Sequence, residues 1–567
     1  MHDDPTPLDP IATVATVVVA ASMVVFATYR VVPVDVPWHL ATGRWILEHG
    51  FMTTNTFSWT HPEHPLYQQY PLFQVPIALL TDTFGYEALS LWFGAVWAGA
   101  LVAWMRWGAP FRSASAWPLL WLGAAVGLQR HAVQRPEAHT ILFLGLMLIA
   151  LDHWRRTGKR RGLVATVFLQ WCMANSHQLF PLGLVVQFGV WAQLLAVRYG
   201  GTRLGLDPTD RDRPLGPISA TLAASTAILA LSPLGLRIFL VPLQTLATVM
   251  EQGAASGSGN LPGELAPVWT DPLAFLVALL VGGWFLLTTA RTRGHWRLDE
   301  VGVGLLGLVM TAAALRGISF LGVTCAAAAV RMAARRPALL PRESLVHPAS
   351  TLGALGLAAS LVWLSLASPP ILYGSQRGLG KAIGGWGEDL CQALHDAPPP
   401  GEVLNLGWAA GNPLIGCAFP EKRPFVDPRF EAYPSDFLWK GTEASSDPAI
   451  LRELIDTWSP GFVVVEMRLQ PAHERLAELV DDGWGLTHLD ADFAVAVPPG
   501  PYLDAHRLTD WSFRSPVDDY PVLRAQQLVH HAALLARLEV GDSEHWLALA
   551  REVEHPLITS ELEQFGF

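Results

Sequence analysis

The chain has 567 residues, of which 51% are hydrophobic and only 15% charged, and its mean hydropathy is +0.30. This balance argues against an ordinary soluble protein. In addition, apolar runs recur at the length that crosses a bilayer, about 17–25 residues. The net charge of −11 and the absence of a basic run away from those apolar stretches argue against a nucleic-acid partner. The composition therefore predicts a protein that crosses the lipid bilayer several times.

Apolar stretches predict about eleven membrane-spanning helices. We place them at 11–29, 86–105, 114–129, 138–153, 162–177, 179–197, 216–232, 272–290, 299–315, 317–333 and 349–368. The residues before the first stretch are acidic and lack the positive region of a cleavable signal peptide, so we expect a retained span. Residues 233–271 fit no span, and we expect there a re-entrant or interfacial helix followed by a flexible loop, or a plain linker.

Positive charge alternates between the loops. Cations are frequent in every second loop, for example at 155–161, and rare in the others, where only six arginines stand between spans. Because cytoplasmic loops carry more Lys and Arg, the N-terminus is predicted to be cytoplasmic and the residues after about 370 to lie outside the cytoplasm.

The first outer loop contains a candidate pair of catalytic side chains. Asp35 and His39 are four residues apart at the start of a predicted helix over 36–49, so they can face one point in space. A carboxylate and an imidazole at a membrane surface can move a proton or bind a metal ion. In the alternative interpretation Asp35 only caps the helix, with Pro37 in its first turn.

The few outer arginines form a candidate phosphate site, because arginine grips phosphate through two parallel hydrogen bonds. The alternative is that they snorkel to the interface or form internal salt bridges. The candidates for substrate binding, with one histidine that follows a predicted span, are Arg44, Arg130, Arg135, His177 and Arg316.

Composition changes after the last predicted span. Predicted strands lie at 403–406, 424–426, 461–466, 485–489 and 493–497, with a helix over 448–458, and this alternation indicates an α/β domain. We therefore divide the chain into a transmembrane domain (1–370, with its first outer loop at 30–85), an α/β domain (371–500) and a helical extension (501–567), with helical signals near 516–538 and 542–552. Cys391 and Cys417 can form a disulfide if this region is extracytoplasmic.

Several motifs in order resemble one group of bacterial membrane proteins. The run Asp35-x-x-Trp38-His39-x-x-x-Gly43-Arg44 is followed by Arg135-Pro136-Glu137, Asn175-Ser-His177 and Ser232-Pro-Leu-Gly235. The stretch from Asn405 to Tyr433, which includes Asp427-Pro-Arg429-Phe-Glu431, resembles a signature of the group's soluble domain. These motifs, spread over residues 10–500, resemble glycosyltransferase-like proteins of the GT-C fold.

The resemblance implies a mainly α protein, a GT-C-like transmembrane helix bundle followed by an extracytoplasmic α/β domain. Such enzymes move a sugar from a polyprenyl-phosphate carrier to a lipid, glycan or protein acceptor. Asp35 then matches the acid of the first loop, which acts as general base or metal ligand, with a divalent cation, Mg²⁺ or Mn²⁺, as an option. The expected location is the bacterial inner membrane, with the C-terminal domain periplasmic and open to a protein partner.

The sequence departs from the group's pattern in the first loop. Asn55 stands where related sequences commonly carry a second acid, and this loss weakens a metal site. Glu63, flanked by His61 and His64, is a candidate replacement. The chain is therefore either a glycosyltransferase that uses Asp35, His39 and Glu63, or an inactive relative that binds a lipid-linked glycan or organises an envelope assembly. No internal repeat of the kind found in transporters is evident.

Overall fold

The computed structural model describes residues 21–22, 24–25, 28–66, 70–108, 134–200, 205–244, 268–313, 317–333, 376, 378–382, 384–407, 410–468, 470–512 and 521–567. The chain divides into two compact units. Unit 1 comprises Met1–Tyr29, Tyr70–Phe73 and Ala88–Ser368, and unit 2 comprises Arg30–Gln69, Gln74–Glu87 and Pro369–Phe567. We describe each unit by itself.

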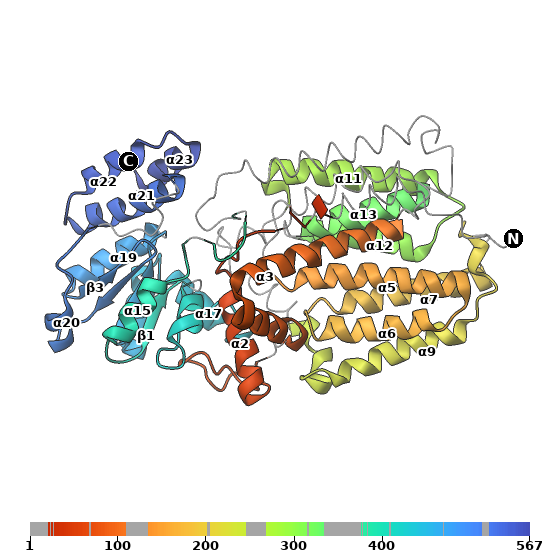
Figure 1. Cartoon of the computed structure of the whole chain (residues 1–567), viewed down its shortest axis with the longest axis horizontal. Helices are drawn as coiled ribbons and strands as arrows, with labels where there is room; N and C mark the ends of the chain where they lie inside the picture. Colours follow the sequence, from red (N-terminus) through yellow and green to blue (C-terminus); the bar gives the residue numbers. More distant parts are fainter. Residues whose placement is uncertain are drawn as a thin grey trace. The chain divides into compact units, whose positions relative to one another are not determined.

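Unit 1 is a bundle of apolar helices, several of which run side by side in Figure 1. Its α-helices are the last part of α3 (Pro71–Gly108), α5 (Glu137–Thr157), α6 (Arg161–Ala174), α7 (Pro181–Tyr199), α9 (Leu215–Ala227), α11 (Pro272–Arg291), α12 (Leu298–Ala313) and α13 (Ile318–Ala333). Short 3-10 turns are η2 (Pro208–Asp210), η3 (Ile228–Leu231), η4 (Gly235–Phe239) and η5 (Val268–Thr270). One apolar core joins these helices, with Trp154 and Phe285 among its largest buried side chains.

Eight of the eleven predicted spans fall on helices of unit 1. The other three, at 11–29, 114–129 and 349–368, lie mostly or wholly outside the described residues, as does most of 233–271. Among the described helices, α3 and α7 are long and apolar enough to cross a bilayer, whereas α6, α9, α11 and α13 contribute shorter apolar stretches. The mainly helical character is confirmed, and the number of membrane crossings stays a prediction.

Unit 2 is built on a four-stranded sheet. Its strands are β1 (Val403–Leu406), β2 (Phe462–Glu466), β3 (Gly485–Leu489) and β4 (Phe493–Val497), in the order β1-β2-β4-β3. Strands β1 and β2 are parallel, while β2–β4 and β3–β4 are antiparallel. Every residue of β1, β2 and β4 is buried, which explains their nearly continuous apolar sequences. The mixed sheet with its helices confirms the predicted α/β character of this region.

Helices and turns surround the sheet and extend beyond it. They are α2 (Val36–His49), α15 (Glu388–Asp396), α16 (Gly411–Pro413), η8 (Leu414–Ala418, a π-helical turn), η9 (Phe430–Ala432), α17 (Ser435–Glu443), α18 (Pro448–Trp458), α19 (Gln470–Asp481) and α20 (Pro501–His506). The C-terminal helices α21 (Pro521–Leu538), α22 (Ser543–Arg551) and α23 (Pro556–Phe565) enclose a small apolar core of their own. The sequence signals found α21 and α22 and missed α23.

Two local predictions were wrong. Residues 424–426 form no strand, because side chains take the place of a strand partner: Asn405 Oδ1 accepts from the N–H groups of Phe425 and Val426 at 2.8 and 3.4 Å, and Asn405 Nδ2 donates to Val426 O. In addition, helix α3 begins at Pro71 within the predicted loop, and it is interrupted at Gly85, whose φ of 79° leaves the helical region. The segment before Gly85 positions the candidate site.

Candidate functional site

Asp35 occupies the N-cap position of α2 but does not cap it. Its side chain accepts no hydrogen bond from the first turn, although Pro37 stands in that turn as expected. The carboxylate is half-buried, at the beginning of a helix whose next five residues are buried. The interpretation of Asp35 as a mere cap therefore loses its main support, since a capping carboxylate accepts from the N–H two or three residues ahead.

The chain around Asp35 is held on both sides by the C-terminal part of unit 2. On the side before Asp35, Val31 forms a β-bridge with Lys381. The N–H of Val31 donates to Gly380 O, and the N–H of Ala382 donates to Val31 O, both at 2.8 Å. On the outgoing side, Asn412 Nδ2 donates to Val34 O, and a Cβ on Gly416 would lie 3.1 Å from Pro37. These contacts fix the backbone that carries the carboxylate.

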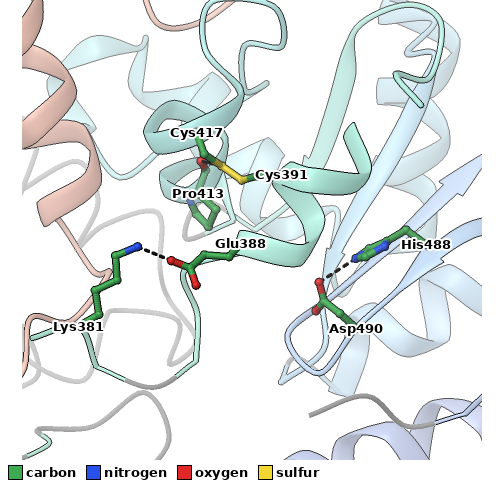
Figure 2. Close-up of a disulfide and its surroundings, with 7 residues drawn as sticks. All are labelled: Lys381, Glu388, Cys391, Pro413, Cys417, His488 and Asp490. Carbon is green, nitrogen blue, oxygen red and sulfur yellow. Dashed lines mark hydrogen bonds and ion pairs between the residues drawn. A yellow bond between two sulfur atoms is a disulfide. The ribbon is translucent and has the colours of Figure 1, made fainter. Parts of the chain in front are cut away.

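A disulfide holds the turn η8, which packs against the start of α2. Cys391 of α15 is bonded to Cys417 of η8, with 5.9 Å between the two Cα atoms, and Figure 2 shows this bridge between the two elements. Leu390 and Leu414 on either side are fully buried in the core of the sheet. The bridge and the core together hold η8 on the sheet, and η8 in turn supports Pro37.

Motif residues of α2 form a seam with the first segment of α3. His39 Nδ1 lies 3.2 Å from Gln74 Nε2, and Arg44 grips Asp82 through Nη2 and Nε at 2.6 and 3.1 Å. Between them, Gly43 approaches so closely that a Cβ there would lie 2.2 Å from the carbonyl oxygen of Gln74. His39 is only 2% exposed, so the geometry supports a positioning role for it more directly than a role in proton transfer.

Arg44 also lines a small pocket beside α2. The pocket encloses about 70 Å³ and is formed by Pro37, Leu40, Arg44, Tyr86, Lys381, Trp386, Glu388, Pro413, Gly416 and Cys417. Lys381 Nζ pairs with Glu388 and lies 4.8 and 5.0 Å from the centres of the Tyr86 and Trp386 rings. Aromatic faces beside paired charges suit a polar ligand with apolar faces, such as a sugar.

The rest of the first loop is attached to a buried ion pair. Arg429 and Asp427 have no exposed side-chain surface and are bonded at 2.7 Å. Arg429 Nη2 donates to Asn55 Oδ1 at 2.6 Å, while Asn55 Nδ2 donates to Ala432 O at 2.9 Å. Burial and the Asp427 carboxylate raise the pKa of Tyr433, whose hydroxyl donates to Asp427, so Tyr433 remains a donor. Asn55 is thus a structural contact at the position where an acid was expected.

Glu63 and its neighbouring histidines lie in the turn that follows. Glu63 is exposed and makes no ion pair with any residue that the structure describes. Burial lowers the pKa of both His61 and His64, and the ring of His61 packs 4.2 Å from that of Phe437. These contacts place the two histidines against the α/β domain, and the catalytic role of Glu63 stays a prediction.

In unit 1, two predicted substrate-binding residues lie near one end of α5. Arg135 lies two residues before the first residue of the helix and is half-buried. His177 Nδ1 lies 3.0 Å from Thr140 Oγ1 on the first turns of α5, and its ring is 6.2 Å from that of Tyr70. The neighbouring His139 is buried among aromatic rings, including that of Phe73 at 5.4 Å. The two other predicted arginines, Arg130 and Arg316, lie outside the described residues.

The donor set for a divalent cation is not assembled among the residues that the structure describes. No three His, Cys, Asp or Glu side chains there lie close enough to hold an ion. Asn55, which occupies the position of the missing acid, is committed to Arg429 and Ala432. The described residues therefore do not fit a metal centre at Asp35, and we derive no step through one.

Some site residues were not singled out from the sequence. Lys381 and Trp386 follow a segment with no motif, and Gln74 and Asp82 lie on a helical segment within the predicted loop. Thr140 was hidden inside a predicted span. Polar residues at helical spacing after Pro71, namely Gln74 and Asp82, are the signal from which the seam with α2 could have been found.

The fold has solved counterparts. No protein-family model and no curated protein sequence matches the chain. An oligosaccharyltransferase of Archaeoglobus fulgidus in complex with Zn and sulfate is similar over 98% of this chain and 84% of its own, with a TM-score of 0.54 and 11% identity. The apo form matches with a TM-score of 0.51 and 11% identity, over 84% of this chain and 72% of its own. The archaeal oligosaccharyltransferase AglB from Archaeoglobus fulgidus, in complex with an inhibitory peptide and a dolichol-phosphate, has a TM-score of 0.53 at 11% identity over the same shares. At this identity the similarity establishes a GT-C-like fold.

Proposed function

We propose that this protein is a membrane glycosyltransferase that moves a sugar from a polyprenyl-phosphate-linked donor to a lipid, glycan or protein acceptor. Two facts support the proposal: the fold resembles that of an oligosaccharyltransferase solved with a dolichol-phosphate, and Asp35 stands at the start of α2 on backbone that Asn412 holds through Val34 O. The second observation carries the proposal, because it concerns this chain's own residue. We place the reaction at the outer face of the bacterial inner membrane, where the positive-inside rule puts Asp35.

In the proposed reaction Asp35 acts as general base. The carboxylate accepts the proton of an acceptor hydroxyl or amide, while the oxygen or nitrogen that loses this proton bonds to C1 of the sugar. The bond from C1 to the phosphate oxygen breaks, and its electron pair leaves with the polyprenyl phosphate. Because Val34 and Pro37 are held by Asn412 and η8, the carboxylate keeps its position without reorganisation during the step.

The other predicted residues would bind and position the substrates. Arg44, beside the aromatic rings of Tyr86 and Trp386, would hold sugar hydroxyls. Arg135 and His177, with Arg130 and Arg316, would hold the donor phosphate, whose charge grows as the bond to C1 breaks. His39 would act by fixing α2 against Gln74, and Glu63 would assist from the following turn.

The test is a glycan and glycolipid mass profile of a strain that lacks the gene. The strain is complemented with wild type, with Asp35→Asn, or with Glu48→Gln, an exposed acid at the other end of the same helix. Wild type and Glu48→Gln are expected to restore a missing hexose or pentose, while Asp35→Asn at equal membrane abundance is not. Restoration by Asp35→Asn would overturn the role of the base.

One observation supports a second candidate function, an inactive relative that binds a lipid-linked glycan or organises an assembly complex. The position of the family's second acid holds Asn55, which serves to attach the loop to Arg429 and Ala432. Under this alternative, Asp35→Asn supports the envelope profile as well as wild type, but a deletion still changes it. The same complementation experiment therefore separates the two functions.

A further inference from the structure

An open apolar groove lies between α5 and α6, two helices that pack side by side in unit 1 (Figure 1). It has a volume of about 510 Å³, and its walls include Leu146 and Ile149 of α5 and Phe168 and Leu169 of α6. Gly162 allows the two helices to touch at one end, since a Cβ there would lie 2.4 Å from Ala150 O. Phe168 is 58% exposed, so the groove is open along its length.

Cations stand at the end of the groove where α5 passes into α6. His153 and Arg161 line the groove itself, and Arg161 Nε donates to His153 Nε2 at 2.8 Å. Lys159 and Arg160 are exposed in the connection between α5 and α6, and Arg156 is exposed in the last turn of α5. The N-terminus of α6, which begins at Arg161, adds the partial positive charge of its first N–H groups.

Within the part of the chain that the structure describes, these exposed cations have fewer carboxylate contacts than the neighbouring Arg155. Arg155, in the last turn of α5, instead contacts Asp299 at 2.7 Å and Asp210 at 3.5 Å. Among the described residues, the four exposed cations have one carboxylate contact, from Arg156 to Asp152 at 3.9 Å, and Asp152 is already bonded to Arg331 at 2.6 Å. Arg155 is therefore used in contacts within the fold. Four exposed positive charges remain available to an anion outside the protein: Arg156, Lys159, Arg160 and Arg161.

We propose that this groove binds an anionic glycerophospholipid. The lipid phosphate contacts Arg161 with Lys159 and Arg160 nearby, and one acyl chain lies along Leu146, Phe168 and Leu169. Charge selects this occupant: a zwitterionic lipid brings no net charge to the four cations, whereas a single anionic headgroup does. The arginine fork matches phosphate oxygens, and the apolar walls exclude a free soluble phosphate as the full ligand. The inference rests on the proposed placement of α5 and α6 in the membrane.

The test measures retained lipid by native mass spectrometry of the full chain after extraction in detergent. The probes are phosphatidylglycerol and phosphatidylcholine with identical acyl chains. The groove variant is Arg161→Gln, and the matched control is Arg198→Gln, an exposed arginine at the end of α7 that does not line the groove. A second groove variant, Phe168→Ala, changes the apolar wall and leaves the charge intact.

We expect wild type and Arg198→Gln to retain phosphatidylglycerol in preference to phosphatidylcholine. Arg161→Gln should weaken phosphatidylglycerol binding about fivefold, the effect of one cation near an anionic headgroup. Phe168→Ala should weaken the binding of this lipid but not that of glycerol phosphate, which has no acyl chain. Equal retention of both lipids, or an equal loss in Arg161→Gln and Arg198→Gln, would overturn the proposal. Asp35→Asn should retain the lipid like wild type, so a failed transferase assay and a failed lipid site can be told apart.

Discussion

The fully buried Arg429 of unit 2 and the arginine cluster of unit 1 are neutralised in different ways. In unit 2, Arg429 has one carboxylate partner, Asp427, and the remaining contacts are neutral, as with Asn55. In unit 1, three arginines share five acids across η2 and the three helices α5, α12 and α13: Arg155, Arg297 and Arg331 with Asp152, Asp207, Asp210, Asp299 and Glu300. A single pair fixes one attachment point, whereas a shared network connects many elements and keeps a second partner when one is lost.

The difference predicts the largest effect for Arg429→Met. The substitution leaves the Asp427 carboxylate fully buried without its partner, and the free energy of unfolding should fall by about 3–5 kcal/mol. Chemical unfolding of the solubilised protein measures it. The double variant with Asp427→Asn removes the orphaned charge and should recover part of the loss. Equal losses in the single and double variants would show that the charge pair is not the cause.

The unit 1 network should be more tolerant. In Asp299→Asn, Arg155 keeps Asp210 at 3.5 Å, so the free energy of unfolding should fall by only about 1–3 kcal/mol. The same unfolding experiment, with the exposed Asp212→Asn as control, tests this expectation. A loss as large as that of Arg429→Met would remove the distinction between a shared and a single-partner arrangement.

A buried histidine in unit 2, His473, should make the free energy of unfolding depend on pH, by an amount similar to the effect expected for Asp299→Asn. Burial lowers the pKa of His473 to about 4 from 6.5. The folded state therefore holds His473 neutral where the unfolded state binds a proton, so its contribution is complete above pH 6.5 and is lost as pH falls toward 4. The loss is about 3 kcal/mol. His473 stacks on Phe565 of α23 at 5.5 Å, and the same ring lies 5.2 Å from that of His530, which is bonded to Glu561 at 2.9 Å.

Hydrogen exchange of α19 and α23 between pH 7.5 and 5 measures this effect, after correction for the intrinsic exchange rate. Faster exchange in acid is expected for wild type, and a smaller acid effect for His473→Gln, which has no group that titrates in this range. An unchanged pH dependence in the variant would assign the effect to other groups.

Asn55→Asp places an acid beside the buried pair of Arg429 and Asp427. The new carboxylate can still accept from Arg429, but it cannot donate to Ala432 O, so the free energy of unfolding should fall by about 1–3 kcal/mol. Asn55→Ala, which loses both bonds, is the comparison variant in the same unfolding experiment. A stabilised Asn55→Asp would indicate that unit 2 tolerates an acid at this position.

The smallest effect on stability is expected at the exposed pair of Arg44 and Asp82. Their side chains are 39% and 43% exposed, so Asp82→Asn should change the free energy of unfolding by less than about 1 kcal/mol. Arg44→Gln should be equally mild for stability but should lower transfer activity, if Arg44 binds sugar as proposed. Matched losses of stability and activity would make Arg44 a seam residue alone.

Local patterns predicted local structure well. The hairpin of β3 and β4 was found with its bounds, because both strands have the expected composition and Asp490 organises the turn by accepting from the N–H groups of Asp492 and Phe493. The ion pair of Asp490 with His488 in that hairpin is drawn in Figure 2. Helix α18 was equally clear, since Asp447 caps it directly before Pro448.

Contacts between distant residues could not be predicted in this way. Asn55 meets Arg429 across 374 positions, and no pattern in either segment indicates the other. The false strand at 424–426 has the same origin, because its partner is the side chain of Asn405 rather than another strand. The Cys391–Cys417 disulfide was recognised as chemically permitted, and the fold of η8 against α15 supplies the proximity that the sequence does not reveal.

The close approach at Gly43 has a mechanical consequence. The α2 backbone contacts Gln74 at Gly43, and His39 and Arg44 bond to Gln74 and Asp82 on either side of this contact. We therefore expect α2 and the 74–84 segment to move as one rigid body. Asp35 stands at the start of α2, and Gly85 interrupts helix α3 directly after the 74–84 segment. Any rotation about Gly85 would displace the carboxylate as well. A spin label on each helix should therefore report a constant distance while substrates bind and leave.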